Sequence, residues 1–202
     1  MAGLGLDPFR LDLLRDPRHN HGGKVIMLAY AFVLLAVVVR FLPHPWAFTP
    51  VVGSLLFFGA HRSRRELWIA LACLAASDVL LTKLVYGFPF GWDYLVTWMW
   101  YGAILGLGTR LERNRKPLWV IAAGLTGSVS FFLLSNFTYW AYWKPFPMNL
   151  KGLEMAYVAG LPFFRHALEG DLLFTIAMFA TPLSFAALSG VFRNLGDRTA
   201  AT

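Results

Sequence analysis

Apolar runs of membrane-spanning length are the feature that most constrains the fold of this 202-residue chain. A helix needs about 20 mostly apolar residues to cross a hydrocarbon layer of roughly 30 Å. Several such runs occur, separated by short polar connections. Only 14% of the residues are charged, whereas a soluble domain carries about a quarter. We therefore predict an all-α integral membrane protein.

The runs predict a bundle of six transmembrane helices within one domain, residues 25–192. The six expected spans are residues 25–42, 50–61, 67–86, 94–109, 118–143 and 171–192. Residues 152–168 are only moderately apolar, so we predict an amphipathic helix at the outer surface there, ahead of the last span. Residues 1–24 and 193–202 are expected to be cytoplasmic tails.

Positively charged residues orient the predicted bundle. If both termini are cytoplasmic, 13 of the 18 Lys and Arg residues fall on the inner side and five on the outer side. Inner loops of membrane proteins carry this excess. We therefore predict a multi-pass protein of the inner membrane with both termini inside. The basic residues form short clusters between apolar runs, which argues for lipid partners and against nucleic acid.

The entry to the second predicted span is unusual. Pro43, Pro45 and Pro50 stand within eight residues, and the apolar run that follows covers only residues 50–61. At 1.5 Å per residue this run reaches about 18 Å, which is too short to cross the membrane. Irregular backbone at membrane depth must be covered by protein or line a wet cavity. We predict that residues 43–50 dip inward as a lid over an outward-facing site; the alternative is an external loop followed by a short tilted span.

Asp78 is the most informative polar residue, because it lies inside the apolar run LACLAASDVLLTKL. Intramembrane carboxylates are costly and indicate a functional role by default. The alternative is a structural carboxylate bonded to a neighbouring helix. Asn136, within FFLLSNFTYW near Tyr139, suits a polar ligand or an interhelical hydrogen bond equally well. The aromatic residues toward the outer ends, Trp46 among them, fit either a headgroup belt or a pocket lining.

Small residues recur at the four-residue spacing that favours close helix packing. The pairs are Ala72/Ala76, Gly102/Gly106, Gly124/Ser128 and Ala186/Gly190.

Catalytic and metal-binding patterns are absent from the sequence. It contains no HExxH, GxSxG or P-loop motif, so we predict no enzymatic activity and no ATP hydrolysis. His44 and His166, with scattered carboxylates, are a weak signal for a metal site. No cofactor is predicted, and the single Cys73 excludes a disulfide within the chain.

Four segments carry a resemblance to known proteins: FTPVVGSLLFFGAH, AASDVLL, LLSNFTYW and GLPFFRHALEGDLLFT. Together they resemble an uncharacterised group of bacterial membrane proteins, over roughly residues 25–192. That group is similar in hydropathy plan to the substrate-binding S-components of energy-coupling-factor transporters. The resemblance implies a six-helix bundle that captures a vitamin-like or metal-linked small molecule from outside. Residues 43–50 would form the gate of this bundle. A separate ATPase module would drive the toppling of the bundle in the membrane. One departure is that the first span has no Ala-x-x-x-Ala pair, the surface by which S-components meet their coupling subunit.

The predicted function is therefore that of a substrate-capture membrane subunit for a small polar or vitamin-like molecule. The predicted ligand-binding residues are Trp46, Thr49, Asp78, Asn136, Tyr139 and Arg165. The alternative is a non-catalytic accessory subunit that packs against other subunits of a larger membrane complex, in which Asp78 is structural. The third possibility is a membrane enzyme that acts on lipid, but the sequence contains no group of residues typical of a catalytic site.

Overall fold

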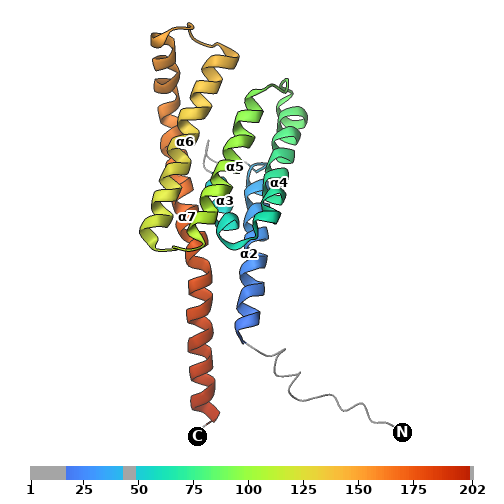
Figure 1. Ribbon diagram of the computed structural model, residues 1–202, viewed down its shortest axis with the longest axis vertical. Coiled ribbons are helices and arrows are strands. Elements are labelled where there is room, and N and C mark those ends of the chain that lie inside the picture. The colour runs from blue at the N-terminus through green and yellow to red at the C-terminus, as the bar shows by residue number, and fades with distance from the viewer. Residues whose placement is uncertain (1–16, 43–48, 201–202) are drawn as a thin grey trace, which may run out of the picture.

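The computed structural model describes residues 17–42 and 49–200, with side chains for residues 23–42 and 49–184. It confirms the all-α prediction: the described part of the chain forms six α-helices and contains no strand (Figure 1). A 3-10 turn, η1 (Arg64–Glu66), precedes α4, and a π-helical segment, η2 (Leu81–Tyr86), follows it. The α-helices are α2 (Pro17–Val39), α3 (Val51–His61), α4 (Leu67–Leu80), α5 (Asp93–Leu111), α6 (Pro117–Trp143) and α7 (Leu150–Ala200).

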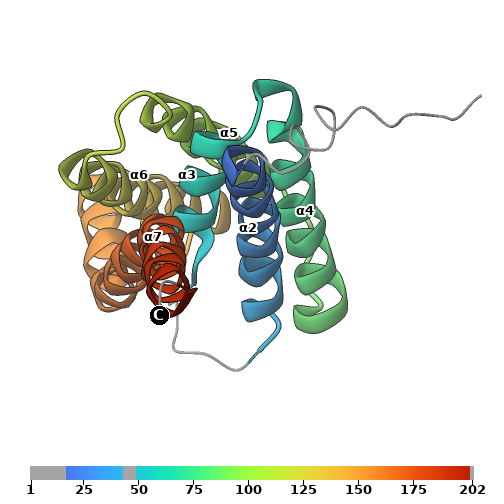
Figure 2. The same cartoon turned by 90° about the horizontal axis from the view of Figure 1, so that it is seen from below.

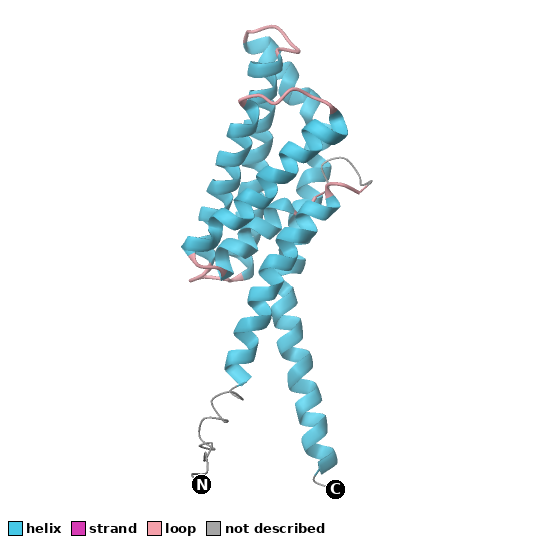
Figure 3. Ribbon diagram, turned by 90° about the vertical axis from the view of Figure 1, so that its right-hand side faces the viewer, coloured by secondary structure: helices cyan, strands magenta, loops and turns pink. Residues whose placement is uncertain are grey.

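The connections between helices alternate between two ends of the bundle. The turns between α3 and α4 and between α5 and α6 lie at one end, which we call the arginine end because Arg62, Arg64, Arg65, Arg113 and Arg115 lie in them. The turns at residues 87–92 and 144–149 lie at the opposite, aromatic end (Figure 1). The first turns of α2 and the last turns of α7 extend beyond the arginine end (Figure 3). The arginine clusters thus lie at the same end as the outer ends of α2 and α7, and the predicted orientation in a membrane stays a prediction.

Helix α3 forms the centre of the bundle. Ten of its 11 residues, Val51–Ala60, are buried, and Figure 2 shows it enclosed between α2 on one side and α6 and α7 on the other. A helix that is apolar all round belongs in an interior. The prediction of a short second helix is confirmed: α3 ends at His61 as expected and begins one residue later than expected.

Two glycines let α3 lie directly against α5. A Cβ atom added to Gly59 would lie 2.3 Å from the carbonyl oxygen of Leu105, and one added to Gly108 would lie 2.6 Å from the carbonyl oxygen of Leu56. On another face of α3, a Cβ on Gly53 would lie 2.9 Å from the backbone nitrogen of Thr175 in α7. The central helix is therefore in backbone contact with two neighbours, which is possible only where side chains are missing.

The C-terminal third of the chain corrects the sequence prediction. The expected outer-surface helix at residues 152–168 and the span at residues 171–192 are one continuous helix, α7, with Pro162 and Pro182 inside it. Proline in a helix interior removes one hydrogen bond and normally kinks or breaks the helix. Contacts with α6 on both sides of Pro162 hold α7 together: Tyr157 donates to the Leu133 carbonyl at 3.0 Å, and Phe164 packs on Phe132.

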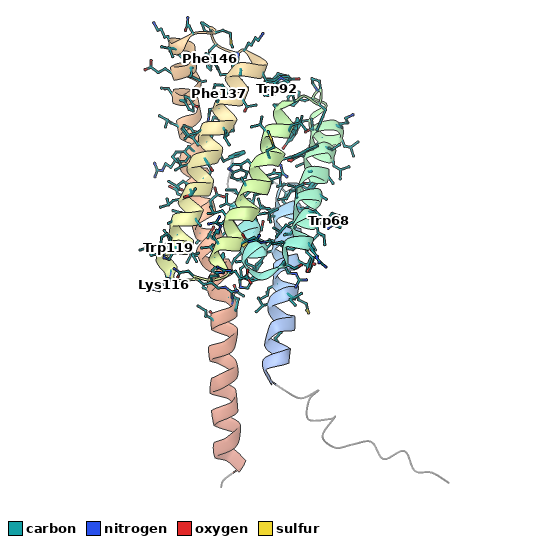
Figure 4. The ribbon with its side chains drawn as sticks, in the orientation of Figure 1. Trp68, Trp92, Lys116, Trp119, Phe137 and Phe146 are labelled. Atoms are coloured by element: carbon teal, nitrogen blue, oxygen red, sulfur yellow. The ribbon has the colours of Figure 1, made fainter. Side chains whose placement is uncertain are left out.

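The outer surface of the bundle is apolar. Every described α-helix except α3 exposes large apolar side chains. Figure 4 shows Trp68 and Trp119 on opposite sides of the bundle, in the half nearer the arginine end, and Trp92 at the aromatic end. Two helical segments, Arg64–Tyr86 and Pro117–Trp143, are long and apolar enough to cross a membrane. The structure thus supports a membrane-associated helical protein, with two candidate spans where the sequence predicted six.

Candidate functional site

Asp78 lies in a buried cluster of donors from two other helices. The carboxylate is 4% exposed and forms an ion pair with Arg40, at the end of α2. Trp98 Nε1 donates to its Oδ2 at 3.0 Å, and the Tyr101 hydroxyl donates to its Oδ1 at 3.4 Å, both from α5. Arg40 also donates to the Ser77 hydroxyl at 2.7 Å. Each carboxylate oxygen is therefore satisfied by the protein itself.

This cluster matches the structural alternative for Asp78 more closely than the ligand-binding one. An intramembrane carboxylate needs a partner, and Arg40, Trp98 and Tyr101 fully meet that need. Lys83, five residues along from Asp78, is exposed and makes no ion pair with it. Nothing in the sequence pattern indicates that Asp78 pairs with Arg40.

A second buried carboxylate, Asp171, lies at the start of the central helix. It is 6% exposed, accepts a hydrogen bond from the Ser128 hydroxyl at 2.7 Å, and faces the backbone N–H of Val52. The first N–H groups of a helix have no partner within the helix, and Pro50 at the N-cap of α3 supplies none from its side chain. Asp171 therefore caps α3 from the neighbouring helix α7.

A cavity of about 200 Å³ opens between α5 and α6 in the aromatic half of the bundle. Its polar lining consists of Asp93 and Thr97 on α5 and Ser135 and Thr138 on α6. Asp93 is the first residue of α5, and its Oδ1 atom is buried with no hydrogen-bond partner among the described residues. Sequence reasoning missed Asp93 because it lies at a helix end, where a carboxylate is usual.

Aromatic rings complete the lining of this cavity. Tyr94 and Trp100 contribute from α5, and Phe131, Tyr139 and Trp143 from α6. Tyr139 and Trp143 are about half exposed, so they stand at the mouth. The Tyr94 hydroxyl is hydrogen-bonded to Thr82 at 2.5 Å, and Trp100 Nε1 donates to Ser130 at 2.9 Å. Their polar atoms are therefore occupied, and these two residues offer the cavity mainly their rings.

The other predicted ligand residues do not converge on this cavity. Asn136 lines a separate, more apolar cavity of about 150 Å³ between α6 and α7, where its Nδ2 donates to the Phe132 carbonyl at 2.8 Å. Arg165 is exposed on α7 and pairs with Glu169 at 3.1 Å. Thr49 is half-buried ahead of α3. Trp46, with most of the predicted gate, lies outside the described residues.

Among the predicted residues that the structure describes, Tyr139 alone lines the α5/α6 cavity, and Asp78 lines neither this cavity nor the α6/α7 one. The structure thus divides the set among an ion-pair cluster, two cavities and the surface. In the described part of the chain, no three His, Cys, Asp or Glu side chains group so that they would hold a metal ion. His166 lies 3.9 Å from Glu169 on the exposed face of α7.

The fold and these cavities define a helical protein with an apolar exterior, a buried central helix and two small cavities toward the aromatic end; a larger, more open cavity of about 710 Å³ lies at the arginine end. The chain belongs to a family of unknown function (DUF6580), which matches residues 21–190. No curated protein and no solved structure matches the chain. The family match confirms the resemblance to an uncharacterised family, while the similarity to S-components stays a prediction.

Proposed function

We propose that this chain is a multi-pass membrane subunit that captures a small polar or vitamin-like molecule for uptake, in the manner of an S-component. In this arrangement the arginine end faces the cytoplasm together with both termini, and the aromatic end faces outward. The apolar surfaces of the outer helices contact lipid. A separate ATPase module would energise transport, because the chain has no nucleotide-binding motif of its own.

The observation that carries this proposal is the α5/α6 cavity. Ligand sites are concave and mostly apolar, with a few polar groups that fix orientation. Here Asp93, Thr97, Ser135 and Thr138 stand among aromatic rings. Pockets for drug-sized ligands measure roughly 300–1,000 Å³, so a cavity of about 200 Å³ suits a smaller molecule.

Native mass spectrometry of the detergent-purified protein tests the proposal. The wild type is expected to retain a small molecule, and Thr97→Phe, which fills the cavity from α5, is expected to lose it. Leu133→Phe is the matched control, because Leu133 is 49% exposed and does not line the cavity. Equal small-molecule spectra for the wild type and Thr97→Phe would refute capture at this site.

A second candidate function is that of an accessory subunit in a larger membrane complex. The Asp78 cluster favours it, because a carboxylate fully engaged by Arg40, Trp98 and Tyr101 serves packing and needs no ligand. The same spectra separate the two functions. Retained membrane proteins, with no small molecule lost in Thr97→Phe, would support the accessory role.

A further inference from the structure

The charge of the α5/α6 cavity is negative and unbalanced. Asp93 is the one charged residue among the described residues that line it. No ion pair of Asp93 exists in the described structure, in contrast to Asp78, which is paired with Arg40. A carboxylate beside a cavity without a basic neighbour favours a cationic occupant.

One oxygen of the Asp93 carboxylate also lacks a hydrogen-bond donor. Its Oδ1 atom is buried without a hydrogen bond, and a buried acceptor left unsatisfied carries a desolvation penalty. Gly91 permits this burial: a Cβ there would lie 2.7 Å from Asp93 Oδ1 and 2.1 Å from the Tyr142 hydroxyl. A ligand that donates to, or places positive charge beside, this carboxylate would relieve the penalty.

The aromatic lining selects among cations. Tyr94, Trp100, Tyr139 and Trp143 line the same cavity as Asp93. Aromatic faces attract ammonium groups, and clusters of such rings are the usual way to hold alkylated ammonium. A divalent metal ion, in contrast, prefers several carboxylate or carbonyl oxygens, and this lining offers a single carboxylate.

We propose that the α5/α6 cavity binds an alkylammonium group, with Asp93 as its counter-ion and the surrounding rings as its cage. This inference rests on the proposed function, because it names the chemistry of the molecule captured. The ammonium group comes either from a free small molecule or from the headgroup of a membrane lipid. Tyr139 and Trp143, about half exposed at the mouth, are positioned to contact either source.

Calorimetric titration tests the proposal with the full-length protein in phosphatidylglycerol nanodiscs. The probes are choline and its uncharged carbon analogue, in which carbon replaces the nitrogen. Choline is expected to bind and the analogue to bind at least tenfold more weakly. Asp93→Asn is expected to weaken choline binding about ten- to a hundredfold, because the variant removes a charge-assisted interaction. Glu154→Gln is the matched control: Glu154 is an exposed acid of α7 outside the cavity, and its replacement should leave binding unchanged.

A ring substitution tests the cage separately. Tyr139→Leu is expected to weaken choline binding about two- to fivefold, whereas Tyr139→Phe, which keeps the ring, should bind as the wild type does. The lipid source is tested in phosphatidylcholine nanodiscs by native mass spectrometry. Retention of phosphatidylcholine by the wild type, and its loss in Asp93→Asn, assigns the site to a lipid headgroup; choline binding in phosphatidylglycerol assigns it to a free molecule.

Three results overturn the inference: equal affinity for choline and its carbon analogue, unchanged choline binding by Asp93→Asn, or neither choline nor phosphatidylcholine bound by the wild type. These failures differ from failure of the proposed function. If native mass spectrometry shows a molecule that Thr97→Phe loses and Asp93→Asn keeps, the cavity captures a ligand that is not an ammonium compound. If Thr97→Phe loses nothing, capture itself is refuted.

Discussion

Substitution of Gly59 by alanine should force the central helix away from α5. The added Cβ would lie 2.3 Å from the Leu105 carbonyl oxygen and within 3.0 Å of the Gly108 Cα atom. Both atoms belong to the backbone, so no side chain can rotate away. Relief requires the two helices to separate by about 1 Å, because ordinary carbon contacts lie at roughly 3.5–4.0 Å.

The expected loss of stability follows from the weaker packing that this separation leaves between α3 and α5. A buried side chain makes about 40–60 atom contacts worth roughly 0.1–0.2 kcal/mol each, and a gap of 0.5–1 Å forfeits about a quarter to a half of each. For an interface about the size of one such side chain, the forfeited energy is roughly 1–6 kcal/mol. Overpacked cores are destabilised by about 1–3 kcal/mol. We therefore expect Gly59→Ala to lower the free energy of unfolding by about 1–3 kcal/mol, where the two ranges overlap.

Unfolding of the detergent-solubilised protein, followed by tryptophan fluorescence, measures this cost. Gly106→Ala is the matched control: it lies on α5 two residues from Gly108, and a Cβ there meets nothing within 4 Å. A destabilisation of about 1–3 kcal/mol corresponds to a melting temperature about 2–12 °C lower. Gly106→Ala should melt at or slightly above the wild type, because alanine is the better helix former. The double variant Gly59→Ala/Gly108→Ala should cost less than the sum of its parts, because the helices need to separate only once.

The reasoning would be refuted if Gly59→Ala and Gly106→Ala unfolded within about 0.5 kcal/mol of one another, the usual spread for surface substitutions. That result would mean that α3 and α5 do not approach at Gly59. Additive costs in the double variant would refute a narrower point, namely that both methyl groups act on one helix separation.

Three further perturbations test other parts of the fold by the same unfolding measurement. Arg40→Leu should cost about 3–5 kcal/mol by leaving Asp78 buried and unpaired, and Arg40→Leu combined with Asp78→Leu should recover most of it; additive costs would contradict the pairing. Asp171→Ala should cost about 1–3 kcal/mol by leaving the start of α3 without an acceptor, while the Ser128 hydroxyl can still donate to the Gly124 carbonyl at 3.2 Å; an unchanged stability would contradict the capping role. Gly87→Ala should cost about 1–2 kcal/mol through backbone strain alone, because Gly87 has a φ of 66° and open space around its Cα; Gly87→Asn should cost less, and equal costs would argue for a steric cause.

Helix positions were largely predictable because proline and arginine clusters mark them in the sequence. Pro50 and the arginines after His61 bracket α3, and Pro117 opens α6 at its first residue. Apolar runs and their periodicity indicate helices from the sequence alone, without information on which helices contact one another. The one error in helix division, at α7, has a tertiary cause: packing of α7 on α6 on both sides of Pro162 keeps the helix intact where proline would normally interrupt it.

Pairings between helices were not predictable, because one sequence does not show which faces meet. Gly102 and Gly106 have the spacing of a packing motif, yet both are exposed. Gly59 and Gly108 lie where α3 and α5 come into backbone contact, although these two residues are far apart in the sequence. Asp78 was predicted to be important, but a single sequence does not identify Arg40 as its partner. Asp93 was overlooked because its isolation becomes visible only when its neighbours are known.

The half-length central helix explains where the cavities lie. Helix α3 starts at the level of Gly127 and Thr175, since Val52 contacts the former and Gly53 the latter. Toward the arginine end from there, α3 fills the space between α5, α6 and α7. Toward the aromatic end no described helix continues it. The α5/α6 and α6/α7 cavities both begin there: one uses α6 from Phe131 onward, and the other uses α6 from Ser128. A third cavity, of about 710 Å³, lies at the opposite end of α3, beside Ala60 and Arg115. The late start of α3 therefore accounts for the two cavities of the aromatic half of this bundle.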